Sequence, residues 1–392
     1  MAKYLITGGG FGNNGAESML YSLITEIRRK DNDSEITIIC ASGYEKGIES
    51  KLNNIKIIEE DIKTRLKILN PFIYAINKIF NKSYEIQAAF QNCDYVFDVT
   101  GLGLTSKWGK NTNRRLLTTV CLAKKFNKKV ILFPQSFGPF DYTKKQKITK
   151  TMIKNVLKKA DLIFAREKEG YDLLKSLGLN NVELSSDVVI QDKGDYNGIY
   201  KEDIVADLDV QDNTVLIIPS YVVFGMVDNK KLLNLYKNAI NRLSDLGYKI
   251  VISYYDNNDI EFAQQIFETV KDNTNVKFID KKLNCIEYSQ ILSKFTFVIT
   301  SRFHSAVHSY KKITPCMVIG WAVKYKELTE SVNQQDYLFD CRNNLDENLF
   351  MDKLNYLVNN IHDEKAKISA GISKIQENNC FNRVWEELSN DR

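Results

Sequence analysis

Short apolar runs alternate along the chain with longer stretches in which apolar residues recur every three or four positions. The runs predict buried strands, and the stretches predict amphipathic helices. Two series of predicted strands follow each other: residues 4–7, 36–39, 95–99, 130–133 and 162–165, then residues 214–218, 250–254, 276–279, 296–300 and 318–320. Because strands that alternate with helices favour a parallel sheet covered on both faces, this pattern predicts an α/β protein with two doubly wound domains.

A polar, Asp-rich segment separates the two series. Residues 193–211 lack apolar periodicity, and this composition indicates a linker. We therefore predict an N-terminal Rossmann-like domain over residues 1–195 and a C-terminal Rossmann-like domain over residues 212–375. The last segment, residues 376–392, contains a helix with Trp385 that we expect to return to the N-terminal domain.

Composition and charge exclude several classes of protein. The 392 residues are 44% hydrophobic and 26% charged, as in ordinary soluble proteins. The net charge of +5 (54 − 49) suits anionic substrates but is too small to indicate a nucleic-acid partner. The seven cysteines form no C-x-x-C pair, which indicates reduced thiols in a cytoplasmic protein and no metal site. We find no signal-peptide pattern and no apolar run of about 18 residues that could span a bilayer.

A glycine-rich loop follows the first predicted strand. Gly8 to Gly15 precede an amphipathic helix, so backbone N–H groups at the helix start are available to an anion. Gly10, Gly12 and Gly15 fit the weak G-x-G-x-x-G dinucleotide pattern. However, the second predicted strand ends in Cys-Ala-Ser at residues 40–42, without the acidic residue that would hold a ribose, and this argues against a nicotinamide cofactor.

The segment from Asp61 to Tyr84 is both basic and apolar. Lysines and an arginine alternate there with Leu, Ile and Phe around Pro71. Such a stretch can lie on a lipid surface, with apolar side chains inserted and lysines facing anionic headgroups. It can equally form two ordinary helices that pack on the core, and the sequence leaves both interpretations open.

The stretch from Thr300 to His308 carries the most concentrated chemistry of the chain. Ser301, Arg302 and His304 follow a buried predicted strand, at the edge where open parallel sheets bind ligands. Arg302 offers a fork of donors that fits carboxylate or phosphate, and a histidine can exchange a proton near neutral pH. His304 and His308 lie one helical turn apart. Because no third ligand follows at a recognisable spacing, this pair does not indicate a metal.

Several further motifs come at the ends of predicted strands, and together they resemble one family. In order along the chain, the following segments resemble the polysaccharide pyruvyl transferase family: Gly12-Asn13-x-Gly15-x-Glu17, Gly101-x-Gly103, Pro134-Gln135-Ser136-Phe137-Gly138-Pro139, Ala165-Arg166-Glu167, Asp187 and Ser301-Arg302-Phe303-His304. The similarity spans roughly residues 4 to 335 and depends on the order and spacing of the motifs.

The resemblance implies a fold and a reaction. It implies a glycosyltransferase-B-type architecture with the active site in an interdomain cleft. It also implies transfer of the pyruvyl group of phosphoenolpyruvate, a donor substrate rather than a cofactor, onto two hydroxyls of a sugar to form a ketal. The acceptor is expected in a cell-surface polysaccharide or its lipid-linked oligosaccharide precursor. The enzyme is then expected in the cytoplasm, with peripheral contact to the inner membrane.

The resemblance also assigns roles to residues of this chain. It implies that Arg302 and His304 contact the phosphate and carboxylate of the donor and that Arg166 is a second donor-binding residue. The other substrate-binding candidates are Ser301, Gly12, Asn13, Gly15, Gly103 and Gln135.

Acid–base roles follow from the chemistry of the reaction. His304 or His308 can protonate the methylene carbon or assist departure of phosphate, and the sequence does not choose between them. Glu17 can take a hydroxyl proton from the sugar.

Two departures from the family pattern leave alternatives open. Ala16 stands where the family has Asp, and Ser136 replaces a glycine. A glycosyltransferase of the same architecture that uses a sugar nucleotide is one alternative. A non-catalytic binding protein on this fold is the other, because a fold alone does not determine function.

Overall fold

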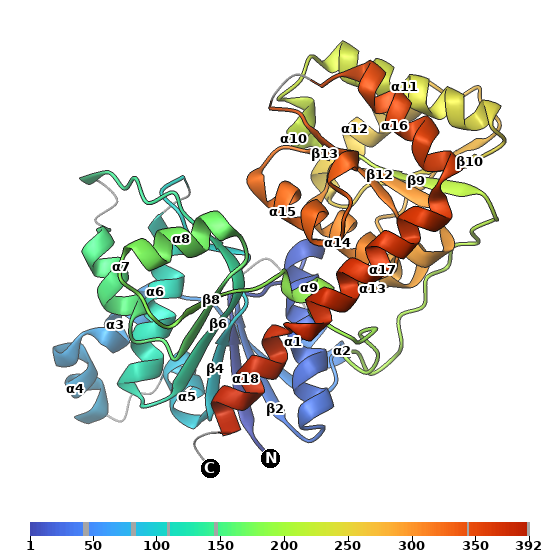
Figure 1. Cartoon of the computed structure of the whole chain (residues 1–392). Helices are drawn as coiled ribbons and strands as arrows, with labels where there is room; N and C mark the ends of the chain where they lie inside the picture. Colours follow the sequence, from blue (N-terminus) through green and yellow to red (C-terminus); the bar gives the residue numbers. More distant parts are fainter. Residues whose placement is uncertain (42–46, 80–83, 108–109, 145–147, 343–344, 390–392) are drawn as a thin grey trace. The chain divides into compact units, whose positions relative to one another are not determined.

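The computed structural model describes residues 1–41, 47–79, 84–107, 110–144, 148–342 and 345–389. These residues form two compact units, one comprising Met1–Asp203 and Asn378–Arg392 and the other Ile204–Glu377 (Figure 1). The first unit therefore includes part of the segment that we interpreted as a linker. Tyr196 is buried there and meets Tyr21 edge to face, with ring centroids 6.0 Å apart.

A parallel sheet of eight strands forms the centre of the first unit. Its order is β3-β2-β1-β4-β6-β7-β8, and β5 pairs with β6 beside this path. The strands are β1 (Lys3–Thr7), β2 (Glu35–Cys40), β3 (Ile55–Glu59), β4 (Tyr95–Asp98), β5 (Leu102–Leu104), β6 (Lys129–Phe137), β7 (Leu162–Ala165) and β8 (Val182–Leu184). Strand order reverses at β1 and β4, and in such sheets ligands bind where the order reverses.

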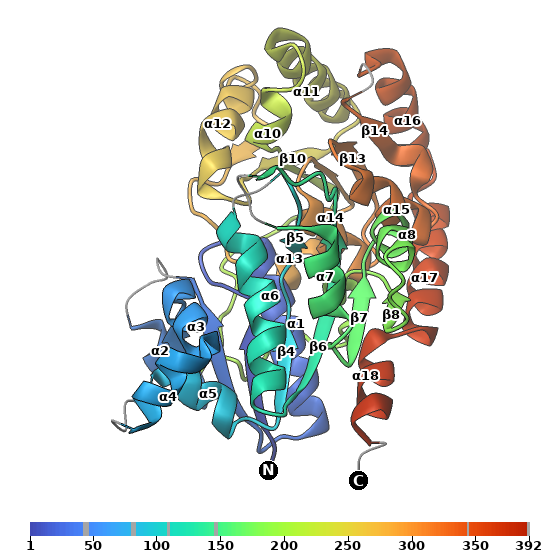
Figure 2. The same ribbon diagram turned by 90° about the vertical axis from the view of Figure 1, so that its left-hand side faces the viewer.

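Helices cover both faces of this sheet, so the strands are buried on both sides and are almost continuously apolar. Figure 2 shows the face covered by α3, α5, α6 and α7, and α1 and α18 lie on the other face. The helices of the unit are α1 (Asn14–Lys30), α2 (Ile48–Lys51), α3 (Ile62–Leu69), α4 (Pro71–Ile79), α5 (Glu85–Asn92), α6 (Lys110–Lys125), α7 (Lys150–Leu157), α8 (Lys168–Ser176), α9 (Val188–Gln191) and α18 (Cys380–Ser389).

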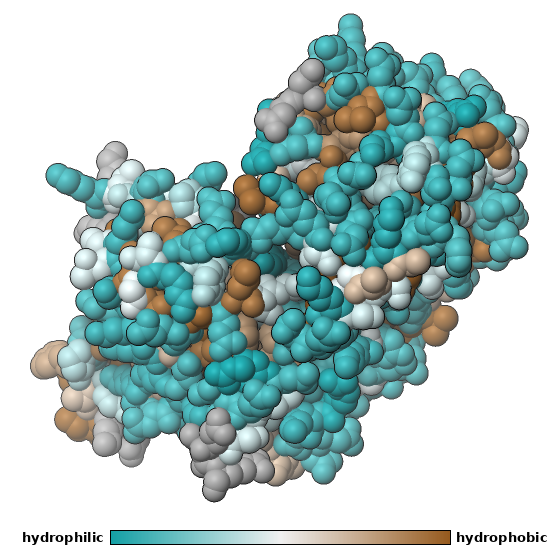
Figure 3. All heavy atoms as spheres, in the orientation of Figure 1, coloured by the Kyte–Doolittle hydropathy of each residue, from teal (hydrophilic) through white to brown (hydrophobic). Residues whose placement is uncertain are grey.

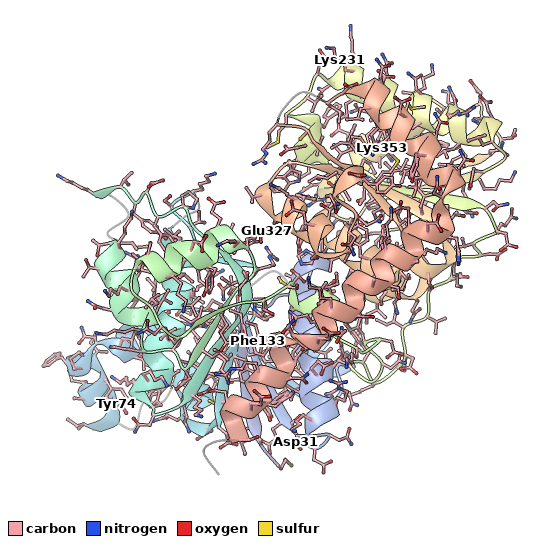
Figure 4. All side chains as sticks on the ribbon, in the orientation of Figure 1. Asp31, Tyr74, Phe133, Lys231, Glu327 and Lys353 are labelled. Atoms are coloured by element: carbon pink, nitrogen blue, oxygen red, sulfur yellow. The ribbon has the colours of Figure 1, made fainter. Side chains whose placement is uncertain are left out.

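The last helix of the chain belongs to the first unit. The ring of Phe381 lies 5.6 Å from that of Phe133 in β6, and Trp385 meets Phe97 edge to face at 6.3 Å. Figure 4 labels Phe133, which lies among the strands of this sheet beside α18. The helix start is tied down as well, because the backbone N–H of Cys380 donates to Oε1 of Gln191 at 2.6 Å. These contacts bury one face of α18 on the sheet.

The second unit contains a parallel sheet of six strands in the order β11-β10-β9-β12-β13-β14. Its strands are β9 (Thr214–Ile218), β10 (Lys249–Ile252), β11 (Val276–Phe278), β12 (Phe297–Thr300), β13 (Cys316–Gly320) and β14 (Leu338–Asp340). Its helices are α10 (Tyr221–Phe224), α11 (Asn229–Asp245), α12 (Ile260–Glu268), α13 (Cys285–Ile291), α14 (Phe303–Lys311), α15 (Val323–Ser331), α16 (Glu347–Asn359) and α17 (Ile361–Glu377). Here the order reverses between β9 and β12.

The predicted fold class is confirmed, since each unit is a doubly wound α/β domain with a parallel sheet. All ten predicted strands are present, but the prediction missed four others: β3, β5, β8 and β14. β5, β8 and β14 have only three residues each, too few for a period of two to be visible. Residues 108–109 and 343–344, which follow two of these short strands, lie outside the described residues.

Candidate active site

The candidate site of the second unit forms where β9 and β12 end side by side. The hydroxyl of Thr300 donates to the carbonyl of Ile218 at 2.9 Å, and the N–H of Ser301 donates to the same carbonyl at 3.1 Å. These bonds carry the pairing of the two strands one residue past the end of β12. As a result, Tyr221 at the start of α10 and Arg302 at the start of α14 become neighbours, with the guanidinium carbon 5.7 Å from the centre of the Tyr221 ring.

Asp259 holds Arg302 in one orientation. The Nε of Arg302 donates to Oδ2 of Asp259 at 2.6 Å, and Nη2 donates to Oδ1 at 2.5 Å. The carboxylate is itself fixed, because it accepts the backbone N–H groups of Tyr221 and Asp256, both at 3.1 Å. Within the described residues no hydrogen bond reaches Nη1, so one edge of the guanidinium stays available to an anion.

Burial and charge act in opposite directions on this arginine. The side chain of Asp259 is fully buried, and that of Arg302 is 19% exposed. Burial works to lower the pKa of Arg302, but the hydrogen bonds and the charge of Asp259 outweigh it and raise this pKa above its usual value. The guanidinium therefore remains charged at every physiological pH.

The two histidines of α14 differ in environment. His304 lies in the first turn of the helix, is partly exposed and meets the ring of Phe303 edge to face at 5.3 Å. His308 lies one turn further on and is fully buried, and this burial lowers its pKa well below 6.5. A histidine that stays neutral at neutral pH has no proton to give as an acid. His304 is therefore the better candidate for a general acid.

A second cation and a group of aromatic rings lie beside Phe303. The Nζ of Lys324 stands 4.7 Å from the centre of the Phe303 ring and 5.2 Å from that of Trp321. Tyr325 stabilises the segment just before α14, because its hydroxyl donates to the carbonyl of Ser301 at 2.8 Å. Two positive side chains thus flank the start of α14, as a ligand with several negative charges requires.

In the first unit, the glycine-rich loop after β1 is bound to the start of α1. Asn13 caps the helix, and its side-chain oxygen accepts the N–H groups of Gly15 and Ala16 at 3.1 Å. Glu17 folds back and accepts the N–H of Gly12 at 2.6 Å. Gly12 has a φ of 89°, a conformation that residues with a side chain rarely adopt. The structure thus brings Gly12, Asn13, Gly15 and Glu17 together. The carboxylate of Glu17 stabilises the loop through its hydrogen bond from Gly12.

Arg166 lies at the carboxyl end of β7, and the protein itself satisfies its guanidinium. Nε donates to Glu167 at 2.8 Å, Nη1 to Asp187 at 2.7 Å, and Nη2 to the hydroxyl of Ser136 at 2.6 Å and the carbonyl of Gly101 at 3.3 Å. With two buried carboxylates as partners, this arginine joins the end of β7 to the segments that contain Gly101 and Asp187 and to Ser136 near the end of β6. Its geometry suits a positioning role better than direct contact with a donor.

Gly103 and Gln135 lie close to this arginine. Gln135 is fully buried in β6, and its amide approaches Asp98 at 3.4 Å. A Cβ at Gly103 would come within 2.5 Å of Oε1 of Gln135, so the glycine is needed for the side chain to fit. Within the described residues, no group of three His, Cys, Asp or Glu side chains is placed to hold a metal ion.

Sequence reasoning missed three residues of the site in the second unit. Asp259 gave no signal, because nothing in the sequence pairs it with an arginine 43 positions later. Lys324 follows a predicted strand by four residues, which was a usable signal. Tyr221 follows Ser220 at the end of another predicted strand and offered a similar signal.

Two Rossmann-like units, each with polar loops at the carboxyl edge of a parallel sheet, place this protein in the class of glycosyltransferase-B-type folds. Solved structures of this type match nearly the whole chain. UDP-GlcNAc 2-epimerase from Methanocaldococcus jannaschii is 15% identical, with a TM-score of 0.59 over 91% of this chain and 92% of that one. UDP-GlcNAc 2-epimerase from Neisseria meningitidis, bound to UDP-GlcNAc, is 11% identical, with a TM-score of 0.61 over 100% of both chains.

A third structure, a mutant of S. aureus TarM in complex with UDP and two further ligands, is 12% identical, with a TM-score of 0.58 over 100% of this chain and 99% of that one. At such identities the likeness shows the fold alone. The family follows from the sequence, because the family model for polysaccharide pyruvyl transferases matches residues 13–322. The chain belongs to the polysaccharide pyruvyl transferase family, which confirms the resemblance drawn from the motifs.

Proposed function

We propose that this protein transfers the pyruvyl group of phosphoenolpyruvate to a sugar of a polysaccharide or of its lipid-linked precursor. The observation that carries this proposal is the Arg302–Asp259 pair. It presents one edge of a charged, oriented guanidinium at the start of α14, the helix whose first turn carries His304, in a member of the pyruvyl transferase family.

The donor requires such a site. Phosphoenolpyruvate carries about three negative charges, and burying them without partners would cost several kcal/mol. Arg302 supplies a planar fork for the carboxylate or the phosphate, and Lys324 supplies a compact point charge for the other group. The exposed ring of Tyr221 lies next to the guanidinium of Arg302.

The reaction needs one acid and one base. Protonation of the methylene carbon by His304 makes the neighbouring carbon electrophilic, and a first sugar hydroxyl adds to that carbon and gives its proton to the base. Phosphate then leaves, a second hydroxyl closes the ring, and the proton of that hydroxyl passes to the departing phosphate, so that the products are the cyclic ketal and hydrogen phosphate. A correctly placed proton donor contributes about 10² to 10⁴ in rate.

In the first unit, the loop of Gly12, Asn13 and Gly15 is our candidate for binding the acceptor. Glu17 stays our candidate for the base, although its carboxylate already accepts the N–H of Gly12. To accept a proton from the sugar, the carboxylate of Glu17 must give up its hydrogen bond from the N–H of Gly12. Replacing Glu17 should therefore change both the affinity for the acceptor and the rate.

A sugar-nucleotide-dependent transferase is the second candidate. The N. meningitidis neighbour holds UDP-GlcNAc and the TarM neighbour holds UDP, which favours this alternative at the level of the fold. A binding protein without turnover is the third. Neither alternative requires a general acid at the start of α14.

The test is turnover with phosphoenolpyruvate and a panel of glycans with free vicinal or 4,6-diols. We expect release of inorganic phosphate in step with a ketal methyl signal in the NMR spectrum of the glycan. His304→Asn should reduce the rate by about 10² or more, and His308→Asn should retain most of it. Phosphate release from no glycan, together with turnover of a nucleotide sugar, would reject the proposal.

A further inference from the structure

Helix α4 exposes a stripe of bulky apolar side chains. Phe72 is 73% exposed, Ile76 is 38% exposed and Ile79 is 76% exposed. With 3.6 residues per turn, positions spaced by four and three residues fall on one side of a helix. In the space-filling view, apolar side chains appear at the surface where Figure 1 draws α4 (Figure 3).

The opposite side of α4 holds the helix to the first unit. Tyr74 packs against the core there, 6.2 Å from the ring of Phe126, and Nζ of Lys125 lies 3.9 Å above its ring. Figure 4 labels Tyr74 on this outlying helix. Since Tyr74 already anchors the helix, the stripe of Phe72, Ile76 and Ile79 is not needed for folding.

The neighbouring helix α3 adds positive charge to the same surface. Lys63, Leu66 and Lys67 are exposed, and they lie on one side of the helix. The sequence from Ile62 to Tyr84 contains no acidic residue. Of the two interpretations left open for this segment, core packing holds for Arg65, which is fully buried and ion-paired with Glu60 at 2.8 Å and so cannot face lipid.

We propose that α3 and α4 form a docking surface for a bilayer with anionic headgroups. Phe72, Ile76 and Ile79 insert into the headgroup and acyl boundary, while Lys63 and Lys67 contact the lipid phosphates. The inference deepens the proposed function and rests on it in one respect, because a lipid-linked acceptor lies at such a surface. Within the described residues no helix is long and apolar enough to cross a membrane, so the contact proposed here is peripheral.

Charge and shape favour a bilayer as the occupant over a protein. Residues 62–84 supply cations and no acid, and the one carboxylate of the segment, Asp61, already caps α3 by accepting the N–H of Lys63 at 2.9 Å and the hydroxyl of Thr64 at 2.5 Å. A lipid phosphate layer requires no more than such cations. The apolar part is one row of side chains on a convex helix, which suits a fluid boundary that adapts to its shape.

The test is co-sedimentation of the full chain with vesicles of phosphatidylcholine containing about 30% phosphatidylglycerol, beside pure phosphatidylcholine. One variant carries Phe72→Ser, Ile76→Ser and Ile79→Ser, and a second carries Lys63→Glu and Lys67→Glu. Each inserted apolar side chain is worth about tenfold in partitioning, so the first variant should bind at least about a hundredfold more weakly. Each lysine near an anionic surface is worth about fivefold, so the second should lose about 25-fold or more, and wild-type binding should fall with salt.

Matched controls replace equally exposed residues elsewhere. The apolar control is Val205→Ser with Met226→Ser and Leu349→Ser, three exposed side chains of the second unit. The charge control is Lys230→Glu with Lys231→Glu, two exposed lysines near the start of α11, of which Figure 4 labels Lys231. Both controls should bind vesicles as the wild type does, and unchanged melting temperatures would show that all four variants fold.

Three outcomes would overturn the inference. They are no binding of the wild type to anionic vesicles, equal binding of the test variants and their controls, or a concentration-dependent dimer of the wild type that does not form in the apolar variant. The last outcome would make the stripe an interface between two copies of the chain. Affinity for phosphoenolpyruvate and turnover of a soluble glycan should be the same in the wild type and in every variant. Failure of those two assays with normal vesicle binding would count against the proposed function alone.

Discussion

Replacing Asp259 by asparagine tests whether this carboxylate orients the donor-binding arginine. The substitution keeps the shape of the side chain but removes the charge and turns one acceptor oxygen into a donor. In the wild type, both oxygens accept from donors: Oδ1 from Arg302 and the N–H of Tyr221, and Oδ2 from Arg302 and the N–H of Asp256. An amide group in this place must therefore face at least one N–H with its own N–H.

The size of the effect follows from burial. Removing one partner of a buried ion pair destabilises a protein by about 3–5 kcal/mol. Because Arg302 keeps 19% of its side chain exposed and can turn toward water, we expect the lower end, about 3 kcal/mol. For a unit of this size, that corresponds to a fall in melting temperature of about 6–12 °C. Loss of one oriented, charge-assisted hydrogen bond should also weaken phosphoenolpyruvate binding at least about tenfold.

The assay combines thermal unfolding with calorimetric titration of phosphoenolpyruvate, and Asp187→Asn is the matched control. Asp187 is the buried partner of Arg166 in the first unit, at 2.7 Å. Both variants should lose stability, but only Asp259→Asn should lose donor affinity. If Asp259→Asn were destabilised and still bound the donor like the wild type, orientation of Arg302 would not matter. If Asp187→Asn lost the donor instead, Arg166 would be the binding arginine after all.

Three further predictions concern single residues. Burial holds the pKa of His308 below its unfolded value near 6.5, so the stability that the neutral imidazole confers is complete above that pH and is lost as the pH falls. Between about pH 6.5 and 5.5, the free energy of unfolding, measured in urea, should therefore fall by about 1 kcal/mol less in His308→Gln than in the wild type. An equal fall in both proteins would contradict this. Lys324→Met should weaken phosphoenolpyruvate binding about fivefold or more and change stability by less than about 0.5 kcal/mol, and an unchanged affinity would remove Lys324 from the site. Gly371→Ala in α17 should destabilise by about 1–3 kcal/mol in chemical denaturation although alanine favours helices, because its Cβ would lie 2.5 Å from Cα of Val332; a stabilised variant would refute this contact.

The sequence was sufficient for the frame of the fold and for the loops that follow its strands. Buried parallel strands are continuous apolar runs, and the glycine-rich loop after β1 and Arg302 after β12 could be placed at strand ends for that reason. Short edge strands such as β8, with three residues, leave no such signal.

Contacts between distant segments could not be predicted. The pairing of Arg302 with Asp259 depends on how two helices start next to neighbouring strands. The periodicity of apolar residues in a single sequence carries no information on such a long-range contact. Arg65 is a second example. The sequence left open whether its basic amphipathic stretch faces lipid or the core, and the structure shows that the side of α3 that carries Arg65 faces the core, where Glu60 neutralises it.

The two histidines illustrate why residue type alone did not settle a role. Both lie in one helix, four positions apart, and both can in principle donate a proton. Only the packing of α14 shows that His308 is fully buried while His304 stays partly exposed. Burial is a property of the tertiary structure, so the sequence alone could not show which histidine is the better candidate for the general acid.

The most direct test of the central claim is a calorimetric titration of phosphoenolpyruvate, and separately of UDP-GlcNAc, into the wild-type protein and into Arg302→Ala. The account predicts that phosphoenolpyruvate binds the wild type, that Arg302→Ala abolishes this binding, and that UDP-GlcNAc binds neither protein. Saturable binding of UDP-GlcNAc to the wild type, with none of phosphoenolpyruvate, would contradict it.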